Sequence, residues 1–148
     1  KAIPKTAPKN VVVSRSISDA IAKVNQYRAE HGRGPVTLHR QLNDAALRHA
    51  RAMAAQDFFS HTGADGSTMG RRLTQTGYIW GLVAENIAAG QKNPSEALQT
   101  WIDSPGHRHN ILMKGVIHIG LAHVRRDPDQ GEVSFEDYWV LVLATPIK

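Results

Sequence analysis

The sequence predicts an α+β layered domain, with helices in the first two thirds of the chain and strands in the last third. Three observations predict this class. Apolar residues recur at helical spacing from residue 17 to about residue 112, a β-branched stretch follows at 116–124, and a near-continuous apolar run occupies 138–145. A chain of 148 residues suits one domain with a proper core, which we place at residues 16–148.

The first 15 residues differ in composition from the rest. Pro4 and Pro8 stand among lysines and small residues, and this stretch holds too few large apolar side chains to fold alone. We therefore expect residues 1–15 to form a flexible N-terminal arm or linker.

Composition also excludes several functional classes. The net charge is +5, but the first 15 residues hold four of the 18 basic residues, so that 14 basic residues face 13 acidic ones in the remainder. A nearly neutral body argues against a nucleic-acid partner. The absence of cysteine excludes disulfides, thiolate metal sites and cysteine nucleophiles. The longest apolar run, 139–144, is far shorter than the ~20 residues that a membrane span needs.

Two helices are predicted in the first third of the chain. Apolar residues on one face of 17–27 predict the first helix, with Gly32 as its stop. Asn25 and Arg28 on this helix belong either to a solvated flank or to contacts that fix neighbouring loops. An alanine-rich stripe over 38–57 predicts the second helix. His49 lies on that stripe, where a histidine is more often a hydrogen-bonded core residue than a ligand.

The sequence of the middle of the chain predicts that Glu85 lies in an apolar environment. Ser67 or Thr68 is placed to cap a short helix that ends at Gly77. The aromatic and apolar segment 78–83 should then lie against the core and lead to Glu85. A carboxylate in such surroundings must be paired, hydrogen-bonded or metal-bound, because an isolated buried charge is costly.

Two consecutive helices are predicted between residues 93 and 112. Asn93 is a good N-cap, Pro94 suits the first helical position, and the helix should stop at Asp103. Ser104 and Pro105 repeat the same start signal for the next helix, whose first turns carry His107 and His109.

The last third of the chain predicts a β-hairpin. The stretches 116–124 and 138–145 indicate two strands, the second of them buried on both faces. The polar segment 125–137 contains the turn signal Asp-Pro-Asp-Gln-Gly at 127–131, so the two strands should pair in antiparallel fashion across a long exposed loop.

The order and spacing of several short motifs over residues 16–145 resemble the bacterial branch of the CAP superfamily, also called the SCP/PR-1-like domain. The motifs are Asn25-x-x-Arg28, the alanine-rich helix with His49, Phe59-Ser60-His61-Thr62-Gly63, Gly77-Tyr78, Ala84-Glu85-Asn86-Ile87, Trp101-x-x-Ser104-Pro105-Gly106-His107-Arg108-x-Asn110-Ile111-Leu112 and Ile119-Gly120. The resemblance implies a three-layer α-β-α sandwich with an antiparallel sheet. It also implies a secreted or periplasmic location for the mature form.

The resemblance further implies a central cleft with two histidines and two acidic residues, which in this family often binds a divalent cation such as zinc. His61 and Glu85 match the first histidine and the first acid, and His107 stands for the second histidine. Ser104 occupies the usual place of the second acid, with Asp103 one residue before it. We expect His61, Glu85 and His107 to be the metal ligands, because two imidazoles and one carboxylate can hold zinc with an open fourth position.

Residues around these three are expected to support the cleft. The support set is Asn86, Asp103, Ser104, Arg108 and Asn110, of which Arg108 and Asn110 should pin the loop that carries His107. His109 should take no part, because it faces away from His107 on a helix.

These features lead to one main functional expectation and two alternatives. We expect an exported, monomeric, non-catalytic domain whose cleft binds a divalent cation and a small apolar or lipid-like ligand. The first alternative is a metal-assisted peptide or ester hydrolase in which Glu85 is the general base. The second is a protein-interaction module that retains the cleft only as a vestige of the fold.

Overall fold

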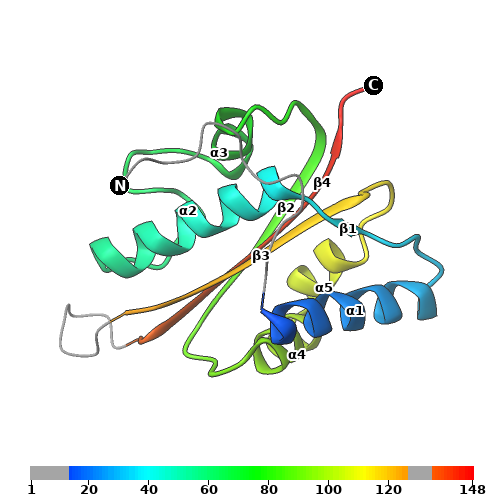
Figure 1. The fold of residues 1–148 in the computed structure, drawn as a ribbon, viewed down its shortest axis with the longest axis horizontal. Coiled ribbons are helices and arrows are strands. Elements are labelled where there is room, and N and C mark those ends of the chain that lie inside the picture. The colour runs from blue at the N-terminus through cyan, green and yellow to red at the C-terminus, as the bar shows by residue number, and fades with distance from the viewer. Residues whose placement is uncertain (1–13, 127–134) are drawn as a thin grey trace.

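The computed structural model describes residues 14–126 and 135–148, and Figure 1 shows three layers with a sheet in the middle. The elements in chain order are α1 (Arg15–Glu30), β1 (Thr37–Leu38), α2 (Arg40–Gln56), α3 (Met69–Gln75), β2 (Trp80–Ala89), α4 (Pro94–Asp103), α5 (Pro105–Ile111), β3 (His118–Arg125) and β4 (Asp137–Pro146). Helices α2 and α3 cover one face of the sheet, and α1, α4 and α5 cover the other (Figure 1). The predicted α+β class and α-β-α sandwich are confirmed.

The sheet has the strand order β1-β3-β4-β2. Strands β2, β4 and β3 pair in antiparallel fashion, and β3 and β4 form the predicted hairpin. The sequence did not predict β1, which adds a short parallel pair to β3 and makes the sheet mixed. Two residues are too few to show an alternating pattern. Strand β2 is the edge strand at the other side of the sheet, and this position decides where the site lies.

Strand β4 separates two apolar cores. Trp139, Leu141 and Leu143 face the cluster under α1, α4 and α5. Tyr138, Val140, Val142 and Ala144 face the cluster under α2 and α3. The prediction that this strand is buried on both faces is confirmed, because eight consecutive residues of β4 are buried.

Most predicted helix starts are correct. Thr68 Oγ1 accepts from Arg71 N at 3.2 Å, and Asn93 Oδ1 accepts from Glu96 N at 2.9 Å. Helix α2 starts later than predicted because Leu38 belongs to β1, and His39 caps the helix through Nδ1, which accepts from Gln41 N at 3.2 Å. Ser104 takes the N-cap position of α5, but its side chain makes no cap hydrogen bond.

The apolar segment 78–83 is only partly against the core. Tyr78 is buried, but Ile79 is 56% exposed and Leu82 is 43% exposed. The expectation that this segment lies against the core is correct for Tyr78, Trp80 and Val83. Ile79 and Leu82 are exposed because β2 is an edge strand, whose continuous buried stretch begins only at Ala84. From Ala84 to Ala88 every residue of β2 is buried, so Glu85 does enter from a buried stretch.

Some expectations fall on residues that the structure does not describe. Of the arm predicted for 1–15, only Ser14 and Arg15 are described, and they cap and begin α1. The turn predicted at 127–131 lies outside the described ranges. Within those ranges, no helix combines the length and the apolar character that crossing a bilayer requires.

Candidate functional site

The centre of the site is the buried carboxylate of Glu85 on β2. Its Oε2 accepts a hydrogen bond from Arg72 Nη2 of α3 at 2.7 Å, and its Oε1 accepts from His61 Nδ1 at 3.0 Å. The side chains of Glu85 and Arg72 are only 1% and 3% exposed. The prediction that Glu85 must be paired is therefore confirmed, and its main partner is the guanidinium of Arg72.

His61 is held in a defined orientation. The loop after α2 is fixed from below by His49, whose Nε2 donates to the carbonyl oxygen of Ser60 at 2.7 Å. Burial lowers the pKa of His49, which keeps this ring neutral, and the prediction that His49 is a hydrogen-bonded core residue is confirmed. Because a carboxylate oxygen only accepts, His61 Nδ1 carries the proton toward Glu85. When the ring carries one proton, that proton is on Nδ1 and the lone pair is on Nε2.

Two asparagines fasten α5 to the edge strand. Successive residues of β2 face opposite sides of the sheet, so Glu85 points toward α3 and Asn86 points toward α5. Asn86 Nδ2 donates to the carbonyl oxygen of His107 at 3.0 Å. Asn110 Nδ2 donates to Asn86 Oδ1 at 2.9 Å and also approaches the carbonyl oxygen of Glu85 at 3.4 Å. These hydrogen bonds fix α5 beside the carboxylate of Glu85, but none of them involves the carboxylate oxygens.

A cleft of about 530 Å³ lies along this edge of the sheet. Its walls come from the loop and α3 on one side of β2 and from α5 on the other. The lining residues are His61, Thr62, Thr68 and Met69 on the first side, Val83, Ala84 and Glu85 on the strand, and His109, Asn110 and Met113 on the second side. The cleft therefore combines apolar side chains with a few polar groups.

The lining of the cleft differs from the expectation for His109, which was predicted to take no part. His109 lines the cleft, whereas His107 is not among its lining residues. Two positions that are two residues apart on a helix point about 200° away from each other, and the docking of α5 through Asn86 and Asn110 decides which one faces the cleft. His107 Nδ1 is buried without a hydrogen-bond partner among the described residues. Burial, together with the nearby His61, lowers the pKa of His107.

The remaining predicted support residues lie beside the cleft rather than in it. Asp103 Oδ1 accepts from Gln99 Nε2 at 2.8 Å at the end of α4. Arg108 Nη1 donates to the carbonyl oxygen of Ile102 at 3.1 Å and so ties α5 to α4. Ser104 links the two helices. None of these three residues lines the cleft.

The predicted ligands His61, Glu85 and His107 do not fit a three-ligand metal site in this arrangement. In the part of the chain that the structure describes, no group of three or more histidine, aspartate or glutamate side chains could hold a metal ion. Both oxygens of Glu85 are already engaged, one of them by the permanent positive charge of Arg72.

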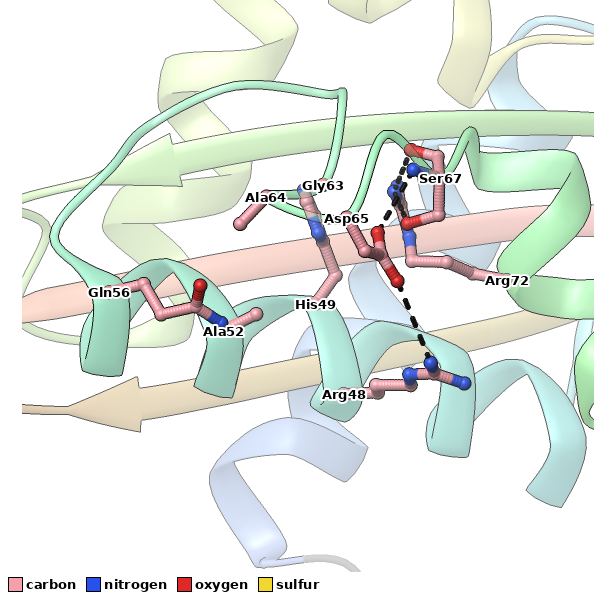
Figure 2. Close-up of a pocket in the computed structure, with 9 residues that line it drawn as sticks. All are labelled: Arg48, His49, Ala52, Gln56, Gly63, Ala64, Asp65, Ser67 and Arg72. Atoms are coloured by element: carbon pink, nitrogen blue, oxygen red, sulfur yellow. Dashed lines mark hydrogen bonds and ion pairs between the residues drawn. The ribbon is translucent and has the colours of Figure 1, made fainter.

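A second cavity, of about 330 Å³, lies behind the ion pair between α2 and the loop that precedes α3, and Figure 2 shows its lining residues. Arg72 belongs to this cavity as well, where its Nη1 donates to the carbonyl oxygen of Ser67 at 2.9 Å. Arg48 and Asp65 approach each other to 3.9 Å at its rim. The guanidinium of Arg72 is therefore fixed from the side of Ser67 as well as by Glu85.

Comparison with curated proteins gives two bacterial relatives. The chain is 30% identical over 112 residues to the uncharacterized protein YkwD of Bacillus subtilis. The aligned region covers 76% of this chain and 44% of the relative. It is 26% identical over 102 residues to the uncharacterized membrane protein YlbC of the same organism, with 69% and 30% covered. The chain thus spans less than half the length of either relative.

Solved structures show the same fold. An extracellular protein of Bacillus anthracis that contains an SCP domain is similar with a TM-score of 0.72 and 26% identity, over 86% of this chain and 39% of that one. An outer surface protein of Borrelia burgdorferi has a TM-score of 0.80 at 15% identity, over 93% and 97%. The profile of the cysteine-rich secretory protein family matches residues 21–143. Although it contains no cysteine, the chain belongs to this CAP family.

Proposed function

We propose that this chain is an exported, non-catalytic domain that binds a small, mainly apolar ligand in the cleft at the edge of β2. One observation carries the proposal, namely a cleft of about 530 Å³ in which Met69, Val83 and Met113 surround a small number of fixed polar groups. Binding sites for small molecules have this composition, because apolar walls supply affinity and a few polar groups set orientation. Methionine suits such walls because its unbranched side chain adapts to different shapes.

The polar group that would orient the ligand is His61. Its Nδ1 is bound to the buried Glu85, so the free Nε2 is an acceptor whose position is set before a ligand arrives. A hydroxyl group on the ligand would donate to this nitrogen. Glu85 and Arg72 act in this proposal as the support that holds the imidazole, not as groups that touch the ligand.

The proposal of export depends on the similar structures. One is described as extracellular and another as an outer surface protein. The near neutrality of the folded body and the absence of cysteine are compatible with any compartment, so they do not bear on this part of the proposal.

Calorimetric titration with 1-octanol tests the binding function. We expect the wild type to bind the alcohol and Met113→Asp, which places a charge in the wall, to lose binding. Ile147→Asp is the matched control, because Ile147 is an exposed apolar residue (63%) that does not line the cleft. Equal binding by Met113→Asp and the wild type would show that the ligand lies elsewhere.

Hydrolysis is the second candidate function, and the geometry changes the residue that would act as base. Glu85 has both oxygens engaged, whereas His61 presents Nε2 on a ring oriented by a carboxylate, as general bases often are. Turnover of an ester panel that disappears in His61→Ala but survives in His109→Ala would support this candidate. No turnover by the wild type would leave the binding function.

A further inference from the structure

We propose that the ligand of the cleft is an anionic amphiphile, whose apolar chain lies in the cleft and whose negatively charged head lies in an adjacent basic pocket. This inference rests on the proposed binding function and specifies its ligand class. The adjacent pocket has a volume of about 600 Å³ and is lined by Arg33, Arg108, His109, Met113 and Lys114, among others. We refer to it as the basic pocket.

Within the described residues, the positive charges of the basic pocket have no acidic partner. Among residues 14–126 and 135–148, no carboxylate lies within 4.0 Å of a side-chain nitrogen of Arg33, Arg108 or Lys114. Elsewhere in the molecule, Arg72 pairs with Glu85 and Arg125 pairs with Asp137. Three cations that line one pocket without a described acidic partner favour the binding of an anion there.

The two arginines are held in place by neutral groups. Arg33 Nε donates to the carbonyl oxygen of Leu112 at 2.7 Å, and Arg108 Nη1 donates to the carbonyl oxygen of Ile102 at 3.1 Å. Both side chains are half-buried. These bonds fix the guanidinium groups but leave their charge and several N–H donors for a ligand. A fixed guanidinium fork matches the paired oxygens of a carboxylate or phosphate.

The basic pocket and the cleft adjoin each other along one side of α5. His109 on α5 and Met113, two residues beyond the end of that helix, line both. A single ligand can therefore pass over Met113 with its chain toward Val83 and Met69 and its head toward Arg108 and Lys114. The head is defined here only by its chemistry, a carboxylate or phosphate attached to an alkyl chain.

Three probes separate the contributions of head and chain. Octyl phosphate carries both, 1-octanol carries the chain alone, and inorganic phosphate carries the head alone. We expect octyl phosphate to bind the wild-type protein at least tenfold more tightly than either of the others, a difference of about 1.4 kcal/mol. We also expect its affinity to fall as salt is raised, because added ions screen the attraction of the charged head.

Charge-removing variants locate the head. Lys114→Gln removes the charge of an exposed side chain that makes no described hydrogen bond, and it should weaken the binding of octyl phosphate about threefold. Arg108→Gln should weaken it about tenfold, with thermal stability measured in parallel because Arg108 also binds a backbone oxygen. Arg51→Gln, an exposed arginine of α2 in the opposite helical layer, is the matched control and should change nothing.

The outcomes distinguish this inference from the function on which it rests. If 1-octanol and octyl phosphate bind equally and Lys114→Gln is without effect, the cleft binds an apolar ligand but the anionic head is refuted. If inorganic phosphate binds as tightly as octyl phosphate, the chain contributes nothing and the amphiphile is refuted. If no probe binds, the binding function itself fails.

Discussion

Glu85 and Arg72 form a buried ion pair, 2.7 Å between Oε2 and Nη2, that joins β2 to α3. The pair accounts for a carboxylate on an otherwise apolar strand. It also explains the orientation of His61, which is bound to the other oxygen of the same carboxylate. The orientation of His61 in the cleft therefore depends on the buried ion pair between Glu85 and Arg72.

Removing the negative charge of this pair should destabilise the fold. We expect Glu85→Gln to lower the free energy of unfolding by about 3–5 kcal/mol, because the variant keeps the shape but leaves Arg72 buried with an uncompensated charge. Urea denaturation measures the change. Asp103→Asn, which alters a carboxylate outside the site, should cost less than about 1 kcal/mol. A small loss in Glu85→Gln would show that the pair contributes little.

The same pair should keep zinc from binding tightly. Because Arg72 and His61 occupy the carboxylate, calorimetry with Zn²⁺ should give the same weak signal for the wild type and for the double variant His61→Ala, His107→Ala. A single saturable site in the wild type that the double variant lacks would overturn this prediction and restore the ligand set expected from the sequence.

A histidine cluster at the start of α2 should make the stability depend on pH. Tyr78 Oη and His118 Nδ1 are 2.8 Å apart, and the rings of His39 and His118 lie with centroids 4.4 Å apart. Burial lowers the pKa of His39 below its ordinary 6.5, and the nearby Arg40 adds to the effect. Burial, followed by the nearby His39, lowers the pKa of His118 in the same way. The folded state therefore binds these protons less readily than the unfolded state does.

The direction of the pH effect follows from that difference. The contribution of these histidines is fully present above pH 6.5 and is lost as the pH falls below it, because the unfolded chain takes up protons first. Urea denaturation of the wild type between pH 7.5 and about 4.5 should show this decline, and His118→Gln should flatten it. His109→Gln changes an exposed histidine and should leave the slope as it is. An equal slope in His118→Gln and the wild type would contradict the prediction.

Gly120 on β3 marks the closest approach of α2 to the sheet. A Cβ atom at this position would collide with the backbone of Leu42 and Asn43, so we expect Gly120→Ala to destabilise the protein by about 1–3 kcal/mol. Gly106→Ala is the matched control, because a Cβ there meets nothing within 4 Å and alanine favours the helix α5. Thermal unfolding should move in opposite directions for the two variants. A shift of the same sign in both would contradict the packing argument.

Much of the fold could be predicted because its signals are local. Asn93 and Pro94 predict the start of α4 because an asparagine suits the N-cap and a proline suits the first helical position. The apolar run 138–145 predicts a strand buried on both faces. Strand β1 gave no such signal, since its two residues are ordered only by pairing with β3. The exposure of Leu82 was missed for a related reason, because an apolar residue carries no mark of its position on an edge strand.

The site could be predicted only in part, because its partners come together through tertiary structure. The apolar neighbours of Glu85 were enough to predict that its carboxylate is paired, and the partner could have been sought among cations on a nearby helix. Arg72 lies 13 residues away in a short helix beside a second arginine, and no local pattern there indicates which of the two is buried. The choice between His107 and His109 depended on how α5 docks through Asn86, which spacing along one helix does not fix.

The three methionines allow the most direct test of the central claim, that the cleft at the edge of β2 binds a small, mainly apolar ligand. Met69 and Met113 line the cleft, whereas Met53 is fully buried in the core beneath α2. In protein labelled with ¹³C at the methionine methyl groups, titration with 1-octanol should shift the signals of Met69 and Met113 in a saturable way and leave Met53 unchanged. Saturable binding without a shift at Met69 and Met113, or no binding at all, would contradict the account.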